Sequence, residues 1–215
     1  MAFPDLQTVI MSIPGVLMGF TFHEFGHAYV ATLFGDDTPR LQGRVTLSPL
    51  AHLDPIGTIL LLIGGFGWAK PVQINTARLR PRVWGDIAVS MAGVAMNFLL
   101  ALVFYAAALI MFRMGIYGGY DNPVLVDTLY RTAQINVFLI AFNVLPLPPL
   151  DGFHVARYLF PRGMEHVVAT LYRYGPIILI FLFFTPVAAS ILRPVNGAVW
   201  SGVTAIVHAL VGRPI

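Results

Sequence analysis

Long apolar runs alternate with short polar connections along the 215-residue chain. The first run covers residues 6–34 and is followed by Gly35, a residue type that often ends a helix. The second and third runs, residues 83–114 and 124–145, are separated by a turn rich in Gly and Tyr at 115–123. Each run reaches the roughly 20 residues that a helix needs to cross the hydrocarbon core of a bilayer. The pattern therefore predicts three transmembrane helices before residue 146.

Shorter patterns complete the expected fold. Residues 56–66 are apolar but too few to span a bilayer, which predicts a re-entrant or interfacial segment. Polar and apolar residues alternate at 44–47, which predicts a small β-hairpin-like edge near the membrane surface. Residues 177–192 and 195–211 form two weaker apolar segments, either spans or a hairpin. We therefore expect an all-α membrane protein, a polytopic helical bundle of about 4–6 transmembrane segments.

Composition supports a membrane protein. Hydrophobic residues make up 57% of the chain and charged residues 11%, whereas about a quarter of the residues in a soluble domain are charged. The chain contains no Cys, which excludes a disulfide framework and a thiol nucleophile. With several spans in this length, we expect one membrane-embedded domain over residues 1–215.

The distribution of basic residues predicts the orientation of the chain. They concentrate in the connection between the first two spans and in the one after the third: Arg40, Arg44, Lys70, Arg78, Arg80 and Arg82, then Arg157, Arg162 and Arg173. By the positive-inside rule both connections are cytoplasmic and the N-terminus faces outward. The net charge of +3 is therefore attributed to membrane orientation, and we expect the lipid bilayer, not nucleic acid, as a partner.

A polar cluster interrupts the first span at His23-Glu24-Phe25-Gly26-His27. Positions i and i+4 share one face of a helix, so His23 and His27 can present two imidazoles to one metal ion. Glu24 lies beside them and can serve as a general base towards water. A charged side chain at mid-bilayer costs at least about 3 kcal/mol, so a functional role is the default interpretation. The alternative is a satisfied polar cluster between helices.

Two histidines leave a catalytic zinc site one protein ligand short. Asp151 is the leading candidate, because it follows the proline-rich break that ends the third span and precedes Gly152. Irregular backbone is tolerated at membrane depth where it builds a site. The alternative is that Asp151 caps the short helix that follows. His154, one helical turn later, would line the site, donate a hydrogen bond to a ligand or compete as a ligand, and we favour lining.

These motifs together resemble the site-2 protease family of intramembrane zinc metalloproteases. The resemblance covers about residues 12–160 and rests on the following segments: His23-Glu24-Phe25-Gly26-His27, Gly93-x-x-x-Asn97, Asn143-Val144-Leu145-Pro146 and Leu150-Asp151-Gly152. Three further segments resemble the small bacterial branch of the family, which lacks a PDZ or nucleotide-binding regulatory domain: Thr46-Leu47-Ser48-Pro49, His52-Leu53-Asp54-Pro55-Ile56-Gly57 and Ala69-Lys70-Pro71-Val72. The C-terminal helical segments at about 175–212 lie outside this core.

The resemblance implies an activity and a set of roles. The chain would hold one Zn²⁺ and hydrolyse peptide bonds in the transmembrane segments of other membrane proteins, in a bacterial inner membrane, with a site open to the cytoplasm. The family pattern assigns the zinc ligands to His23, His27 and Asp151, and the base to Glu24. It assigns substrate orientation or oxyanion stabilisation to Asn143.

Two candidate substrate contacts come from the middle helix of the family pattern. The Gly-x-x-x-Asn motif places Gly93 and Asn97 near the substrate. For Asn97 a bridge between helices is an equal alternative, because intramembrane amides often hydrogen-bond across helices.

Two other classes of protein are compatible with some of these residues. An ion transporter also carries intramembrane His and Asp, and a non-catalytic scaffold could descend from a protease. A transporter would keep metal movement without Glu24, and a scaffold has no need for four costly polar groups.

Overall fold

A computed structural model describes residues 5–64, 67–115, 123–161 and 163–212. Helices account for nearly all the regular structure of these ranges. In chain order they are α1 (Leu6–Leu33), α2 (Thr38–Leu41), α3 (Pro49–His52), α4 (Pro55–Gly64), α5 (Arg82–Arg113), α6 (Pro123–Asn143), α7 (Asp151–Ala156), the 3₁₀ turn η1 (Arg157–Leu159), α8 (Glu165–Phe183) and α9 (Pro186–Val211). The expected turn at 115–123 and the end of the expected 56–66 segment lie partly outside the described residues, as does Arg162.

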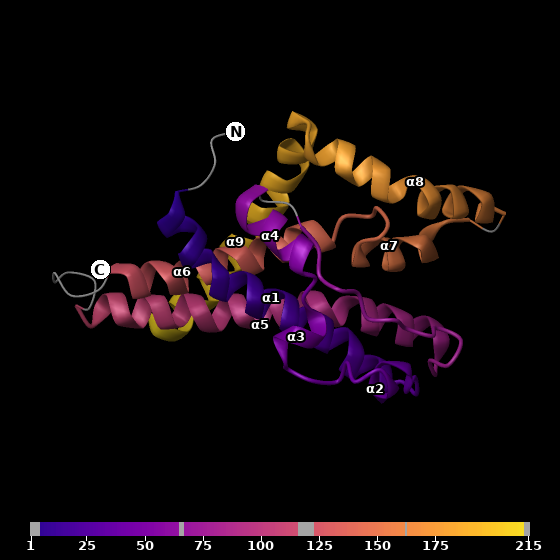
Figure 1. Cartoon of the computed structure of the whole chain (residues 1–215), viewed down its shortest axis with the longest axis horizontal. Coiled ribbons are helices and arrows are strands. Elements are labelled where there is room, and N and C mark those ends of the chain that lie inside the picture. The colour runs from indigo at the N-terminus through magenta and orange to yellow at the C-terminus, as the bar shows by residue number, and fades with distance from the viewer. Residues whose placement is uncertain (1–4, 65–66, 116–122, 162, 213–215) are drawn as a thin grey trace.

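The long helices α1, α5 and α6 pack against one another at the centre of the bundle (Figure 1). His27, near the end of α1, contacts Val89 near the start of α5. His23, one turn earlier in α1, contacts Asn97, further along α5. The two helices are therefore antiparallel.

Small residues let α1 approach α6 closely. A side chain at Gly15 would lie 3.0 Å from the backbone of Thr132, and one at Gly19 would lie 3.3 Å from the amide of Asn136. Gly15 and Gly19 are four residues apart, and so are Thr132 and Asn136, so α1 and α6 run in the same direction. Small residues four apart commonly bring transmembrane helices together, because they allow close backbone contact.

Four described helices are long and apolar enough to span a membrane: α1, α5, α6 and α9. The three spans expected before residue 146 thus have their counterparts, and α9 is the fourth. α9 packs against α5 and α6, where Val203 and Val207 are buried with Val137. Together with the apolar composition, this supports a helical membrane protein.

The expected boundary between the two C-terminal segments was wrong. Residues 177–192 and 195–211 were separated at Pro194, but α9 continues through this residue. The break lies at Phe184 and Thr185, directly before Pro186. Proline fits the first turn of a helix without loss of a hydrogen bond, so Pro186 starts α9, whereas a proline inside a membrane helix is tolerated by its surroundings.

The expected β-hairpin-like edge at 44–47 is absent from the described chain. Its region contains α2 and α3, each with a proline in its first turn, and an isolated bridge joins Leu53 to Ala69. The buried guanidinium of Arg44 donates to the carbonyl oxygens of Ala51 and Lys70, 26 residues away. These hydrogen bonds of Arg44, and not paired strands, stabilise the connection between α1 and α5.

The short apolar segment forms the helix α4, whose placement in the bilayer stays a prediction. Asp54 accepts a hydrogen bond from the backbone N–H of Gly57 and so stabilises the first turn. Leu61 and Leu62 pack against Val16 of α1. One face of α4 thus lies over the α1–α6 pair, close to the polar residues of α1.

We expect Gly15→Leu to loosen the α1–α6 contact. The new side chain would meet Ile135 and the backbone of Thr132, and such overpacking costs about 1–3 kcal/mol of stability. Thermal unfolding in detergent should show a lower midpoint than that of the wild-type protein. Gly202→Leu in α9 is the matched control, because no atom lies within 4 Å of a Cβ atom placed there. An unchanged midpoint for Gly15→Leu would contradict this packing.

Candidate metal centre

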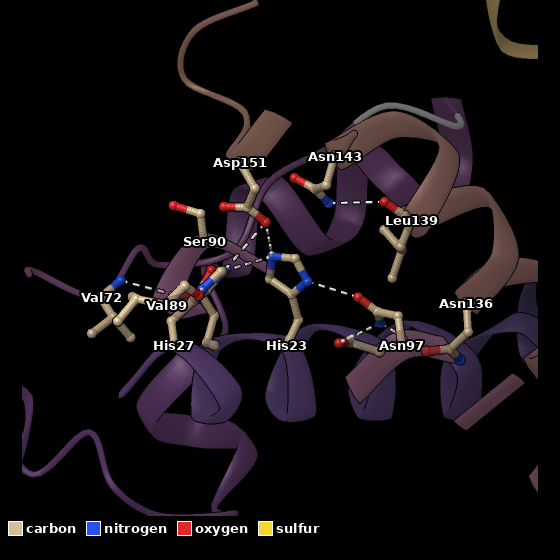
Figure 2. Close-up of polar contacts among 12 residues, drawn as sticks. His23, His27, Val72, Val89, Ser90, Asn97, Asn136, Leu139, Asn143 and Asp151 are labelled. Carbon is tan, nitrogen blue, oxygen red and sulfur yellow. Dashed lines mark hydrogen bonds and ion pairs between the residues drawn. The ribbon is translucent and has the colours of Figure 1, made fainter. Parts of the chain in front are cut away.

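His23, His27 and Asp151 bring three ligand atoms together inside the bundle. The Nε2 atoms of His23 and His27 lie 3.0 Å apart. The Oδ2 atom of Asp151 lies 3.2 Å from Nε2 of His23 and 3.4 Å from Nε2 of His27. Figure 2 shows both imidazoles rising from α1 towards the Asp151 carboxylate, which comes from the start of α7.

The chain between α6 and α7 delivers Asp151 to this position. A side chain built at Gly152 would lie 2.2 Å from the carbonyl oxygen of Val144, so only Gly allows α7 to start so close to the end of α6. Asp151 is the first residue of α7, and the cap residue is Leu150, with no side-chain cap. The alternative role of Asp151 as a helix cap is therefore not what its carboxylate does here.

Hydrogen bonds fix which ring nitrogen of each histidine carries the proton. Nδ1 of His27 lies 2.7 Å from the carbonyl oxygen of Val89, which can only accept, so this Nδ1 carries hydrogen. Nδ1 of His23 lies 2.7 Å from Oδ1 of Asn97. In the neutral rings both Nε2 atoms therefore carry lone pairs, and both are directed at the Asp151 carboxylate.

The orientation of the Asn97 amide follows from a chain of donors and acceptors. Nδ2 of Asn136 donates to the Thr132 carbonyl oxygen, so Oδ1 of Asn136 faces Asn97. Nδ2 of Asn97 donates to that oxygen and to the carbonyl oxygen of Gly19. Oδ1 of Asn97 is then left to accept from His23. A backbone carbonyl of α6 thus determines, through two buried amides, the tautomer of a histidine on α1.

These three residues fit a zinc ion. Ligand atoms at about 2.0–2.1 Å from a tetrahedral zinc lie about 3.3 Å from one another, and the separations of 3.0, 3.2 and 3.4 Å are close to that value. Oδ2 of Asp151 is buried and has no hydrogen-bond donor among the described residues. A cation would offset the repulsion between the two imidazole lone pairs and the carboxylate oxygen that face one another. Catalytic zinc sites commonly have three protein ligands, which is the number found here.

Glu24 lies beside the ligand set in a cavity of about 340 Å³. Its Oε2 atom accepts a hydrogen bond of 2.9 Å from the backbone N–H of Val72 and lies 3.9 Å from the guanidinium of Arg44. His23 and Asn143 line the same cavity. The Glu24 side chain is only 11% exposed, and its partners hold the carboxylate at the cavity wall.

Gly93 makes room for the two imidazoles. A side chain built there would lie 2.5 Å from Nε2 of His27 and 2.6 Å from Nδ1 of His23. α5 therefore has to carry Gly at this point, and Gly93 contacts the ligands themselves.

The remaining predicted site residues fall in different places. Asn143 lies at the end of α6 in the cavity wall, and its Nδ2 donates to the Leu139 carbonyl (Figure 2). Asn97 is completely buried and is not among the residues that line the cavity, which corresponds to the helix-bridging alternative. His154 packs its ring against Tyr172 and does not line the cavity either.

The His52 and Asp54 side chains stabilise the connection before α4. Nε2 of His52 donates to the Thr46 carbonyl oxygen at 2.7 Å. His52 is completely buried, and this burial lowers its pKa. Asp54 caps α4 as described above, so both residues serve the loop and neither belongs to the metal centre.

Comparison with known proteins identifies the family. The model of peptidase family M50 matches residues 11–122 and 120–183. The chain is 40% identical over 185 residues to a Bacillus subtilis (strain 168) protein named "Putative zinc metalloprotease YwhC", with 85% of this chain and 84% of that protein covered. The chain belongs to peptidase family M50. M50 proteases are membrane proteins, in agreement with the four apolar helices.

Two more distant relatives of this M50 chain have similar names. "Putative zinc metalloprotease Rip2" of Mycolicibacterium smegmatis (strain ATCC 700084 / mc(2)155) is 29% identical, with 82% of this chain and 68% of the relative covered. "Putative zinc metalloprotease MJ0611" of Methanocaldococcus jannaschii is 33% identical, with 72% and 73% covered. No solved structure gives a significant match.

Several residues around the M50 site were not predicted from the sequence to take part in it. Val89 and Val72 act through backbone atoms, which leave no mark on residue type. Asn136 and Arg44 carry a weak signal, because a buried amide or guanidinium within or beside a span needs a partner. The sequence does not say which partner.

We expect Gly93→Ala to weaken zinc binding about tenfold or more, the scale seen when the orientation of metal ligands is disturbed. The methyl group would displace both imidazoles. Competition with a chromophoric zinc chelator gives the dissociation constant. Gly197→Ala in α9, which meets no atom within 4 Å, is the matched control and should bind zinc as the wild type does. Equal affinity in Gly93→Ala would show that the histidines do not depend on this space.

Asn97→Leu should also weaken zinc binding, by about 10–100-fold. It removes the acceptor that holds the Nδ1 hydrogen of His23, so the ring can rotate or change tautomer. The same competition assay applies. Asn196→Leu on α9 is the control, because its amide has no contact with the metal centre. Wild-type affinity in Asn97→Leu would contradict the orienting role.

Proposed function

We propose that this M50 chain is a zinc metalloendopeptidase that cuts membrane proteins in or near their transmembrane segments, as a step of regulated intramembrane proteolysis. The observation that carries the proposal is the convergence of His23 Nε2, His27 Nε2 and Asp151 Oδ2 within 3.4 Å of one another beside the carboxylate of Glu24. The zinc-metalloprotease names of the relatives support it.

The residues of the chain divide the reaction among them. One zinc ion per chain, held by His23, His27 and Asp151, would supply Lewis acidity for water and for the scissile carbonyl. Glu24 takes the proton of the attacking water and passes it to the leaving nitrogen. Asn143 uses one N–H for the Leu139 carbonyl, which leaves its other N–H for the developing oxyanion.

The cavity favours an unwound substrate. Apolar side chains make up most of its wall, including Phe20, Phe138 and Phe142. The peptide bonds of a helix are sheltered by their own hydrogen bonds, so a transmembrane segment must open locally before Glu24 and its partners can act. An apolar wall accommodates the side chains of such a segment while the polar groups meet its backbone.

Charge and helix direction support a site open to the cytoplasm of a bacterial cell. His27 lies six residues before the end of α1 at Leu33, about 9 Å along the helix axis. The connection that follows α1 contains the first group of basic residues, which the positive-inside rule assigns to the cytoplasm. We therefore assign the protein to the inner membrane, with membrane-protein substrates as its partners.

Glu24→Gln should abolish cleavage while zinc stays bound, because the variant loses the base but no ligand. Asp151→Ala should lose both. Wild-type and variant proteins would be reconstituted in liposomes with a panel of tagged single-span membrane segments, and products identified by mass spectrometry. Zinc per chain would be measured by elemental analysis. The expected loss for Glu24→Gln is at least about 10²-fold in rate, the scale of general acid–base catalysis.

Two outcomes would contradict the proposal. Cleavage by Glu24→Gln at the wild-type rate would show that the products arise from another protease. Zinc movement across the liposome membrane that persists in Glu24→Gln, with no segment cut by the wild type, would favour an ion transporter.

A further inference from the structure

One face of α5 contacts both histidines of the metal centre and the segment that follows Asp151. The contacts come from Asp86, Val89, Gly93 and Asn97, whose spacings of three and four residues place them on a single side of a helix. Val89 accepts from His27, Gly93 makes room for both imidazoles, and Asn97 accepts from His23. The fourth residue, Asp86, has no contact with a histidine.

Asp86 instead binds the segment that carries the third ligand. Its Oδ2 atom accepts hydrogen bonds from the guanidinium of Arg157 and, at 2.7 Å, from the hydroxyl of Tyr158. Arg157 follows α7 directly, six residues after Asp151. The carboxylate side chain is 3% exposed and the guanidinium side chain 23%, so the pair is largely sheltered from water.

Other contacts hold the first turn and the apolar side of α7 in place. Its first turn is held against α6 at Gly152. Its apolar side is held by Phe153, which is completely buried against Tyr172 of α8. Arg157 also donates to the hydroxyl of Tyr172 at 3.1 Å. Through Asp86, this end of α7 is hydrogen-bonded to α5, the helix that positions both histidines and packs against α7.

Repulsion within the ligand set gives a reason to restrain the position of α7. The Asp151 carboxylate faces two imidazole lone pairs, which repel it until a cation is bound. Without a restraint, α7 would withdraw its ligand from the histidines whenever the site is empty. Paired charges with few alternative partners are suited to fixing such a register, although they add little net stability.

We propose that the Asp86–Arg157 ion pair is a positioning device that holds Asp151 at ligand distance from His23 and His27. The inference rests on the metal site of the proposed function and concerns residues that touch neither the metal nor the substrate. It predicts that loss of the pair weakens metal binding through Asp151 alone.

The test is a double-mutant cycle on zinc affinity in the full-length protein. Asp86→Asn should bind zinc about 10–100-fold more weakly than the wild type. Asp151→Ala should bind more weakly still. In the Asp151→Ala background, adding Asp86→Asn should change the dissociation constant by less than about twofold, because the ligand on which the pair acts is gone.

Two further readouts separate positioning from a loss of fold. The cobalt-substituted Asp86→Asn protein, at saturating Co²⁺, should show an altered visible absorption spectrum, since the ligand geometry has changed. Arg157→Lys keeps the positive charge and leaves no lone buried carboxylate, so it decides the question if Asp86→Asn does not fold. It should bind zinc about tenfold more weakly, within the range seen for residues that orient metal ligands.

The matched control removes a different ion pair of the same types. Asp37 and Arg40 lie 3.4 Å apart with exposed side chains, so Asp37→Asn should leave zinc affinity unchanged. Additive losses in the Asp86→Asn/Asp151→Ala cycle, or wild-type affinity in both Asp86→Asn and Arg157→Lys, would overturn the inference. Absence of zinc binding by the wild type would instead overturn the proposed function.

Discussion

Three ligand atoms, which carry no hydrogens when both imidazoles are neutral, lie within 3.4 Å of one another inside an apolar helical bundle. Such a group is unfavourable until a cation is bound, because its atoms are largely buried and the lone pairs repel. The surrounding chain has to hold it together in advance. The interactions that do so, from the Val89 carbonyl to the two-amide chain of Asn97 and Asn136, also link the helices α1, α5 and α6.

The antiparallel pair of α1 and α5 provides most of this support. α1 contributes the two histidine ligands one helical turn apart. On the facing side of α5, Val89 and Asn97 each provide a hydrogen-bond acceptor, and Gly93 between them leaves room for the imidazoles. The short distance between the two helices requires Gly in α5 where the imidazoles lie against its backbone. The GxxxN pattern of Gly93 and Asn97 therefore describes one structural task, which is to accept two histidines against a helix backbone.

Some features of the fold and of the metal centre could be predicted from the sequence, and others could not. The spans were accessible because membrane thickness sets their length, and the His23–His27 pair because helix periodicity places both on one face. Asp151 followed from ligand count and a chain break. The position of the break before α9 was not accessible, since Pro186 and Pro194 are the same residue type and only packing decides which one starts a helix. Partners such as Val72 act through backbone atoms and have no residue signature.

The failed prediction of strands at 44–47 points to how the carboxylate of Glu24 is held. Polar and apolar residue types alternate there, but the polar Arg44 is the buried one. Its guanidinium, 3.9 Å from Glu24, binds the carbonyl oxygens of Ala51 and Lys70. The same stretch of chain offers the Val72 N–H to Glu24. A strand pair would have satisfied these carbonyls with its own N–H groups. By using an arginine instead, the connection gains a positive charge beside Glu24. The polar loop thereby contributes to the site beside which it lies.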